Sequence, residues 1–402
     1  MIYPKTTVGS ICEYVTSGGT PKTSVESFYN PPIIPWLKTK EVNYCRIYET
    51  ESSISPEGLS RSSAKLIPIN SVIVAMYGQG DTAGRVAINK IPLATNQACC
   101  NLIIDSNKAD YEFVYYSLSA LYDKFVSLKN GGAQPNLNAG IIKSVEIPYP
   151  DIETQRRIAN ILSSYDSLIE NNQKQIKLLE EAAQRLYKEW FVDLRFPGYE
   201  DVAVVDGVPE GWYWCRLEDA VIFDPKITLD RNRTKQSIPM AALSTTSMVL
   251  DPNEFAETES NSGSKFQNGD TLLARITPCL ENGKTAFVWG IDSDEGAIGS
   301  TEFIVMRSRT LNPYIVYLLA RTDSFRQIAI SSMSGSDGRQ RVKSDKLKMI
   351  NYLHPSNSLI RKFTSIAQPI FEQIFGLNHQ CKLAAQARDY LLPKLMSGEL
   401  EV

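Results

Sequence analysis

Long hydrophobic runs are missing from this sequence. A membrane-spanning helix needs about eighteen apolar residues in a row, and no stretch of the chain provides them. The N-terminal segment MIYPKTTVGS also lacks the apolar core of a signal peptide. We therefore predict a cytoplasmic protein that has no membrane partner.

Cysteine and histidine are scarce as well. The seven cysteines are scattered and form no CxxC pair, so we expect reduced thiols with mostly structural roles. The two histidines, His354 and His379, leave little room for a zinc site or for histidine-based catalysis. The sequence predicts no metal ligands.

An excess of positive charge is also absent. The formal net charge is −3 at pH 7, and no segment of the chain is a basic block. This balance argues mildly against a protein that coats nucleic acid without regard to sequence. Any affinity for DNA must come from local patches, or be shared with a partner that supplies more phosphate contacts.

Three short stretches imitate catalytic motifs without completing them. Asn30-Pro31-Pro32-Ile33 lacks the aromatic residue of an adenine methyltransferase motif, and no glycine-rich turn follows a strand to hold S-adenosylmethionine. Asn282-Gly283-Lys284-Thr285 resembles the end of a P-loop, but Pro278 replaces its first glycine. Pro150-Asp151 with Glu153 lacks the E-x-K partner of a metal-dependent nuclease. We expect no catalysis by this chain alone.

What the sequence does contain is a long amphipathic stretch from Asp151 to Phe191. Its apolar residues recur at steps of three and four, the a/d pattern of a coiled coil, with breaks at Asn172 and Gln175. A second apolar stripe runs beside the first, so this helix has two neighbours to pack against. Pro150-Asp151 supplies a start signal and Pro197-Gly198 a stop. Such a helix spans roughly 60 Å.

The same pattern returns between Pro355 and Met396, where Pro369 is expected to kink or loosen the early part. The two helices align at an offset of 205 residues, which also places KSVEIPYP at 143–150 on KMINYLHP at 348–355. The chain therefore reads as domain, helix, domain, helix, a pseudo-two-fold repeat within one polypeptide. Two unrelated domains, each followed by an amphipathic helix, are the alternative.

Between the helices we expect domains rich in β-structure. The boundaries fall at 1–150 for the first domain, 151–196 for the first long helix, 197–355 for a linker and the second domain, and 356–402 for the second long helix and tail. Strands are expected at 33–37, 71–77, 85–88, 99–104, 271–276 and 303–307. One helix is expected over Tyr111–Leu128, and another from Asn312 to about Ile330.

Polar, glycine-rich loops join the expected strands. The loop Asn130–Asn138 is rich in amides and glycine, which suits side chains that reach base edges. The loop Ser334–Lys343 holds several arginines and a glutamine, and these residue types pair with guanine and adenine in the major groove. Ordinary surface loops are the alternative for each. Two domains with the same layout but different loop residues are expected if each domain reads a different DNA sequence.

This organisation resembles the DNA-specificity subunit of type I restriction–modification systems. The similarity covers essentially the whole chain. Its most specific parts are ETQRRIA at 153–159 followed by LYKEWFVD at 186–193, which look like the family's central conserved region, and LLPKLMSGEL at 391–400, which looks like its distal one. PWLKTK at 35–40, ATNQA at 94–98 and QPN at 134–136 recur in its target-recognition domains. The sequence departs from the family at Pro369 and at Gly338–Arg341, where a QPN form is missing.

The resemblance implies an α+β fold with two β-rich target-recognition domains separated by two long antiparallel helices. Each domain would read one half of a bipartite site on double-stranded DNA, and the helix pair would set the spacer. Two methyltransferase (modification) subunits would dock on this framework, and restriction/translocase subunits would join them. S-adenosylmethionine, ATP and magnesium would belong to those partners and not to this chain, which would be a non-catalytic subunit.

The expected DNA contacts are polar and basic residues of the loops and strand ends. In the first domain they are Thr20, Lys22, Lys38, Lys40, Tyr77, Gln79, Arg85, Gln97, Gln134, Asn136 and Asn138. In the second domain they are Arg275, Thr277, Asn282, Lys284, Thr301, Arg339, Gln340, Arg341 and Lys343.

Two other functions stay open at this point. The first is a coiled-coil scaffold whose β domains bind protein, which would show no sequence preference on DNA. The second is the recognition part of a fused methyltransferase–nuclease. That enzyme requires a cofactor-binding domain, and this length leaves no room for one beside two readers.

Overall fold

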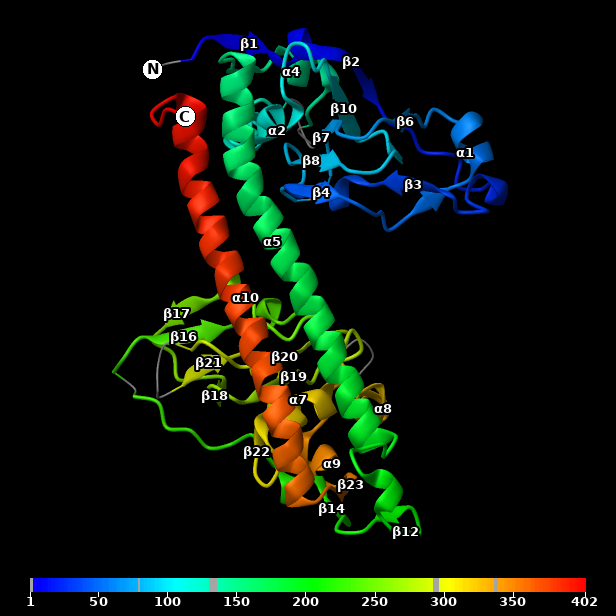
Figure 1. The fold of residues 1–402 in the computed structure, drawn as a ribbon, viewed down its shortest axis with the longest axis vertical. Helices are drawn as coiled ribbons and strands as arrows, with labels where there is room; N and C mark the ends of the chain where they lie inside the picture. Colours follow the sequence, from blue (N-terminus) through cyan, green and yellow to red (C-terminus); the bar gives the residue numbers. More distant parts are fainter. Residues whose placement is uncertain (1–2, 79, 130–135, 231, 292–295, 336–338) are drawn as a thin grey trace. The chain divides into compact units, whose positions relative to one another are not determined.

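The computed structural model describes residues 3–78, 80–129, 136–230, 232–291, 296–335 and 339–402 (Figure 1). The chain divides into two compact units. Unit 1 comprises Met1–Ile169 and Leu383–Val402, and unit 2 comprises Glu170–Lys382. Each unit therefore contains one end of each long helix. Within the described residues, no helix is both long enough and apolar enough to cross a membrane.

Unit 1 is built on a five-stranded sheet with the order β2-β10-β7-β8-β4. Its strands are β2 (Cys12–Ser17), β4 (Cys45–Ile47), β7 (Val72–Ala75), β8 (Val86–Asn89) and β10 (Cys99–Ile104). Every residue of β7 and β8 is buried, which explains why the sequence here runs apolar without alternation. The predicted strands at 71–77, 85–88 and 99–104 are thereby confirmed.

A second sheet of unit 1 has the order β5-β3-β9-β6. It consists of β3 (Ile34–Leu37), β5 (Ser53–Ile54), β6 (Leu66–Ile67) and β9 (Leu93–Thr95). Leu37 and Leu93 of this sheet share one apolar cluster with Ile73 of the five-stranded sheet. The remaining elements of the unit are β1 (Lys5–Thr7), α1 (Pro56–Ser60), α2 (Tyr111–Ser119), α3 (Tyr122–Ser127), α4 (Ala139–Ser144) and β11 (Glu146–Pro148), which pairs with β1.

Unit 2 repeats this plan of two sheets, but among its described residues the first sheet has four strands and lacks a counterpart of β4. One sheet has the order β15-β22-β19-β20 and the other β17-β16-β21-β18. The strands are β15 (Val221–Phe223), β16 (Lys235–Ile238), β17 (Ala256–Thr258), β18 (Ser264–Phe266), β19 (Thr271–Ala274), β20 (Thr285–Phe287), β21 (Ala297–Gly299) and β22 (Phe303–Ser308). β3 pairs in parallel with β9, and β16 pairs in parallel with β21. β14 (Tyr213–Arg216) pairs with β23 (Asn351–His354) just as β1 pairs with β11. The predicted internal repeat is therefore present in the topology.

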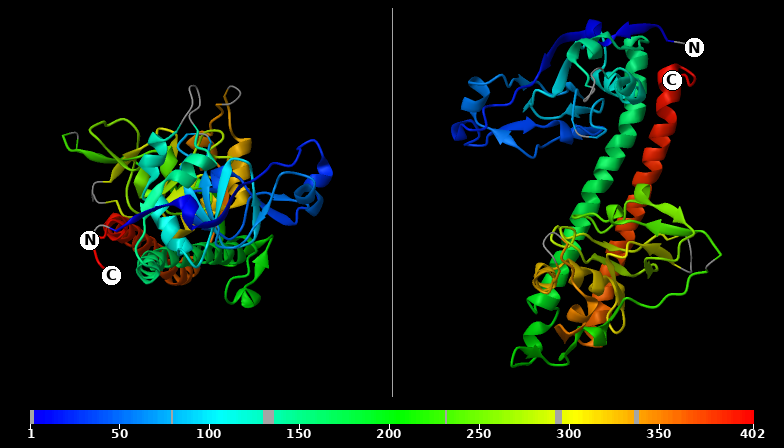
Figure 2. Two further views of the ribbon diagram at one scale, coloured as in Figure 1. Left: turned by 90° about the horizontal axis from the view of Figure 1, so that it is seen from above. Right: turned by 180° about the vertical axis from the view of Figure 1, so that it is seen from behind.

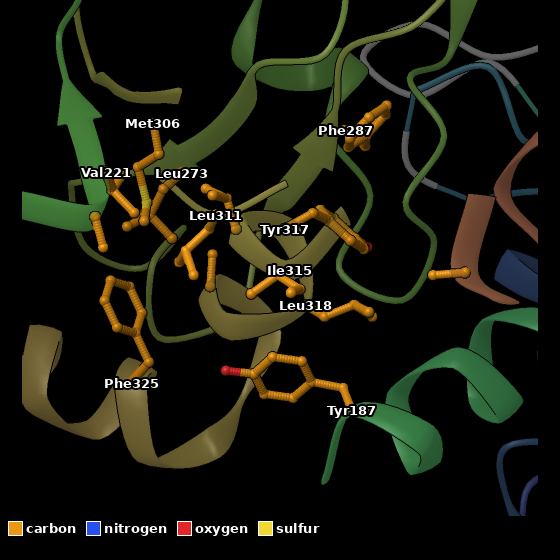
Figure 3. Close-up of a cluster of buried hydrophobic side chains, with 14 of the residues drawn as sticks. Tyr187, Val221, Leu273, Phe287, Met306, Leu311, Ile315, Tyr317, Leu318 and Phe325 are labelled. Carbon is orange, nitrogen blue, oxygen red and sulfur yellow. The ribbon is translucent and has the colours of Figure 1, made fainter. Parts of the chain in front are cut away.

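Three shorter helices of unit 2, α7 (Pro313–Arg321), α8 (Asp323–Ser331) and α9 (Ser344–Lys348), follow the same order as α2, α3 and α4 of unit 1. α6 (Leu217–Ala220) lies between β14 and β15, and a short β12–β13 hairpin (Val204–Val205 and Val208–Pro209) precedes these helices. Figure 3 shows Ile315 and Leu318 of α7 and Phe325 of α8 gathered in one core with Tyr187 from the end of α5. Burying each such side chain contributes about 1.5–3 kcal/mol.

The first long helix, α5 (Ile152–Tyr187), begins where the sequence places its start signal. The Asp151 carboxylate accepts hydrogen bonds from the Thr154 backbone N–H at 3.0 Å and from its hydroxyl at 2.7 Å. This is an N-cap, which satisfies donors that the first turn leaves unpaired. A π-helical turn, Lys188–Val192, closes the element.

The second long helix, α10 (Asn357–Ser397), is continuous. Helical structure extends through Pro369, the position at which the sequence predicts a kink or loosening. Proline removes one helical hydrogen bond, and the apolar packing of Ala367, Phe371 and Ile374, all fully buried, holds the helix on either side of the gap.

The long helices are antiparallel within each unit. In unit 1 the Arg388 Nη1 donates to Asp166 Oδ1 at 2.5 Å, and the Tyr116 hydroxyl donates to Asp166 Oδ2 at 2.5 Å. In unit 2 the Asn172 side chain donates to Gln380 at 3.2 Å. Figure 2 shows the last turns of α10, in red, beside the first turns of α5. Asn172, one of the two residues at which the coiled-coil pattern breaks, is thus a polar contact of the pair.

Two predicted helices are wrong in extent. The segment Tyr111–Leu128 forms α2 and α3, and the segment after Asn312 forms α7 and α8. In the second case Thr322 adopts extended backbone, with ψ 144°, and its hydroxyl accepts from the Phe325 backbone N–H at 3.2 Å. One threonine therefore ends α7 and caps α8, and the apolar pattern continues across the break.

Candidate nucleic-acid interface

Polar segments of unit 1 meet at one end of its central sheet. Because β10 runs antiparallel to β2 and β7, the segments that follow β2 and β7 lie beside the segment that precedes β10. Backbone hydrogen bonds join them: the Met76 N–H donates to the Ala98 carbonyl at 2.8 Å, and the Leu137 N–H donates to the Met76 carbonyl at 2.9 Å. We call residues 18–22, 76–78, 80–85, 96–98 and 136–138 loop cluster 1.

The close approach of these segments requires glycine at one point. The Gly19 N–H donates to the Thr95 carbonyl at 2.8 Å, and a Cβ added at Gly18 would lie only 2.1 Å from the same carbonyl oxygen. Since that neighbour is backbone, it cannot move aside easily. The glycine pair of the TSGGTPKT loop therefore lets two chain segments touch, a structural role for part of that motif.

Unit 2 repeats these hydrogen bonds. The Arg275 N–H donates to the Glu302 carbonyl at 3.0 Å, and the Val342 N–H donates to the Arg275 carbonyl at 3.0 Å. They correspond to the two bonds of Met76 in unit 1. We call residues 275–284, 300–302 and 339–343 loop cluster 2. The two clusters share a backbone frame and carry different side chains.

In loop cluster 1 the structure brings several predicted residues together. The Thr20 hydroxyl contacts the Gln97 side-chain oxygen, and both residues are exposed. Tyr77 and Asn136 are half-buried. The Asn138 side chain accepts from the Ile141 N–H at 2.9 Å and so caps α4. Hydroxyl and amide groups therefore dominate this surface.

Most of the lysine and arginine side chains near loop cluster 1 already interact with a carboxylate or an aromatic ring. Arg85 Nη2 pairs with Asp81 at 2.6 Å, and its hydrogen bond lowers the pKa of that carboxyl. Lys40 pairs with the exposed Glu51, and the Lys38 Nζ lies 5.2 Å from the centre of the Trp36 ring. Lys22 is exposed. Acidic neighbours thus balance the charges of Arg85 and Lys40.

Loop cluster 2 is centred on an ion pair. Arg341 Nε donates to both Glu302 carboxylate oxygens at 2.9 Å, and its Nη2 donates to Oε1 at 2.6 Å. This hydrogen bond lowers the pKa of Glu302, and the charge of Arg275 acts in the same direction. Two arginines therefore face one carboxylate, which leaves an excess of positive charge.

The other predicted residues of unit 2 surround this pair. The Thr277 N–H donates to the Gln340 carbonyl at 3.1 Å. Lys284 is half-buried, and its Nζ donates to the Met240 carbonyl at 3.0 Å. The remaining residues are exposed: Asn282, Thr301, Arg339 and Lys343. Arg275 Nε and Thr277 Oγ1 are buried and have no hydrogen-bond partner within the described part of the chain.

Two predicted contacts, Gln79 and Gln134, lie outside the described residues. Conversely, sequence reasoning missed Glu302. The backbone hydrogen bonds of the two clusters place Glu302 on Ala98, the neighbour of the selected Gln97.

The chemistry of both clusters is hydrogen bonding. Amides, hydroxyls and guanidinium groups present donors and acceptors of the kind that read base edges. Across the residues that the structure describes, no group of three or more His, Cys, Asp or Glu side chains is arranged to hold a metal ion. None of the seven cysteines, all of which the structure describes, forms a disulfide bond. Burial raises the pKa of Cys100 to about 12, so this thiol is not a nucleophile near neutral pH.

Comparison with known proteins agrees with this geometry. Residues 4–181 match the family model of the type I restriction modification DNA specificity domain. The chain is 28% identical to the type I restriction enzyme MjaIX specificity subunit of Methanocaldococcus jannaschii, over 96% of this chain and 91% of that protein. It is also 28% identical to the EcoR124I/EcoR124II specificity subunit of Escherichia coli, over 47% of each.

A solved structure has the same fold. The crystal structure of the S subunit of a type I restriction–modification system from M. genitalium superposes with a TM-score of 0.61, at 16% sequence identity. The match covers 98% of this chain and 96% of that one.

Proposed function

We propose that this chain, which belongs to the family of type I restriction–modification DNA specificity subunits, reads a bipartite DNA sequence with one half assigned to each unit. The observation that carries the proposal is the duplicated loop cluster. The same backbone hydrogen bonds recur at Met76 and Arg275, whereas the side chains around them differ. A duplicated frame with different side chains suits two unlike half-sites.

Base reading would fall to the side chains of the two clusters. Loop cluster 1 offers Thr20, Gln97 and Asn136, which match adenine and other bases through amide and hydroxyl groups. Loop cluster 2 offers Arg341 with the surplus charge of Arg275. Lys22, Arg339 and Lys343 are exposed and suit phosphate contacts, which position the protein without carrying sequence information.

Partner subunits would supply the chemistry. We infer that two methyltransferase subunits dock on this chain and that restriction/translocase subunits join them. S-adenosylmethionine, ATP and magnesium would bind to those partners. Because the net charge is −3, this chain attracts DNA phosphates only weakly. This supports a complex in which the partner subunits make many of the phosphate contacts.

The test is a reconstituted complex of the full-length chain with the methyltransferase subunits of its own host. Incubation with S-adenosylmethionine and a random DNA library, followed by mapping of methylated adenines, should return one motif in two fixed parts. The chain alone should transfer no labelled methyl group, whereas a fused enzyme would. Methylation without any sequence preference would favour the protein-binding scaffold instead.

A further inference from the structure

The ion pair of loop cluster 2 is fixed at both ends by backbone structure. Arg341 bridges Ile276 and Ser334, and the Arg341 N–H donates to the Ser334 carbonyl at 2.9 Å. The Glu302 carbonyl accepts from the Arg275 N–H at 3.0 Å. Neither partner can therefore move far without disturbing the frame on which the cluster is built.

Glu302 occupies only one edge of the guanidinium group. Its oxygens accept from Nε and Nη2 of Arg341. Among the described residues, the other side-chain hydrogen bond of Arg341 is a long one, 3.4 Å from Nη1 to the Arg339 carbonyl. An arginine has five N–H donors in a rigid fork. The outer edge, formed by Nη1 and the second hydrogen of Nη2, therefore keeps two donors side by side.

The pair is also open to solvent. The Arg341 side chain is 42% exposed and the Glu302 side chain 25%. An ion pair at such exposure adds little to stability, typically less than about 1 kcal/mol. Its geometry has a different consequence: a long, flexible side chain is held in one orientation before any ligand arrives, which lowers the entropy lost on binding.

Two parallel N–H donors on a fixed arginine match one base in particular. Guanine presents its O6 and N7 acceptors together in the major groove, and arginine binds them with both donors at once. The residues of unit 1 that correspond by the backbone hydrogen bonds of the two clusters, Asn136 for Arg341 and Ala98 for Glu302, are uncharged. The Gln97 side-chain oxygen already accepts from Thr20, which leaves its amide donors for a base.

We propose that Glu302 is a positioning residue that aims Arg341 at a guanine, so that the half-site read by unit 2 contains a guanine whose recognition needs both side chains. The proposal rests on the proposed function and names one base of one half-site. Glu302 itself does not touch the DNA. Its contribution passes entirely through the guanidinium group that it holds.

The experiment uses the reconstituted methyltransferase complex and a random DNA library, with four full-length chains compared: wild type, Arg341→Lys, Glu302→Gln and Arg309→Lys. Lysine keeps the charge of Arg341 and loses the fork, so preference for guanine at one position should fall by roughly 5- to 150-fold, the size of one bidentate contact. Glu302→Gln should weaken the preference at that same position by a smaller factor. The half-site of unit 1 should not change.

Arg309→Lys is the matched control, because Arg309 is exposed and follows the end of β22, whereas Glu302 precedes its start. It should retain the wild-type motif. The inference is overturned if Arg341→Lys and Glu302→Gln leave the motif intact, as a purely structural pair would, or if both lower methylation of all sequences equally, as a phosphate contact would. A wild-type complex with no bipartite motif would instead refute the proposed function.

Discussion

At the scale of single residues, His354 shows how burial shifts the pKa of a histidine. Its Nδ1 lies 2.8 Å from the Pro355 carbonyl and its Nε2 lies 2.8 Å from the Thr310 hydroxyl. Since a carbonyl only accepts, Nδ1 carries the proton and Nε2 accepts from the threonine. The ring is 2% exposed and stacks on Tyr213 with centroids 4.8 Å apart. Burial lowers the pKa of His354, and the Pro355 hydrogen bond opposes this only in part.

We predict that this histidine makes unfolding easier in mild acid. Below its ordinary pKa of about 6.5 the unfolded chain binds a proton that the folded chain refuses, so the free energy of unfolding falls as the pH decreases. Melting temperatures recorded between about pH 8 and 5.5 should decline more steeply for wild type than for His354→Gln. His379→Gln, at an exposed position, should keep the wild-type slope. Equal slopes for wild type and His354→Gln would contradict the assignment.

Residue-level prediction from sequence rested on residue type. Arg341 was selected because arginine pairs with guanine; the structure places it in loop cluster 2, and its contact with DNA stays a prediction. Glu302 was not selected, since its role depends on a neighbour 39 positions away. Lys284 and Arg85 looked free in the sequence, yet the structure gives them a carbonyl and a carboxylate partner. Charge partners of this kind arise from tertiary contacts that no local pattern encodes.

At the scale of elements, the two ends of the helix pair differ in chemistry. In unit 1 the pair is held by the partly buried contact of Arg388 with Asp166, whose side chains are 24% and 12% exposed. The 205-residue offset places Phe371 at the position of Asp166 and Ala183 at that of Arg388, and both are buried in the core of unit 2. One repeat thus uses charge where the other uses an aromatic ring.

We predict that Asp166→Ala or Arg388→Ala alone destabilises unit 1 by about 3 kcal/mol, because each leaves a partly buried charge without its partner. The double variant Asp166→Leu with Arg388→Leu should recover most of that loss. Urea unfolding of the full-length chain measures all three. Asp389→Ala, which removes the exposed partner of Arg388, should cost less than about 1 kcal/mol. Additive losses in the double variant would argue against this mechanism.

Element prediction was accurate where apolar periodicity was long. Both long helices were found because their patterns persist over many residues, and the strands β3, β7, β8, β10, β19 and β22 were found from short apolar runs. Other strands, such as β2 and β15, were not predicted. The breaks between α2 and α3 and between α7 and α8 were missed, since the same apolar face continues across them. At Thr322 the threonine hydroxyl caps α8 and so interrupts the helix. The strong apolar pattern on both sides of Thr322 hides this capping residue in the sequence.

At the scale of the whole molecule, the helices α5 and α10 run through the point where the chain passes between the units, at residues 169–170 and 382–383. We predict that inserting about four residues after Ile169 and the same number after Lys382 lengthens the accepted spacer by about one to two base pairs, because each helix grows by about 6 Å. Methylation mapping should show unchanged half-sites on either side.

The same insertion in the exposed turn at Asp206-Gly207 should alter neither spacer nor half-sites. An unchanged spacer after the helix insertions would contradict the proposal that helix length sets spacer length. The sequence predicted this organisation through its repeat. An a/d pattern alone fits parallel and antiparallel pairs alike, so the antiparallel arrangement was predicted from the family resemblance and not from the periodicity.

The interleaving of the units has a consequence for synthesis. Leu395 and Met396 belong to the apolar cluster of unit 1 together with Val8 and Ile158, so the core of unit 1 cannot be completed until α10 has been synthesised. A nascent chain that stops before α10 would therefore leave the apolar interior of unit 1 exposed, although the rest of that unit had already left the ribosome.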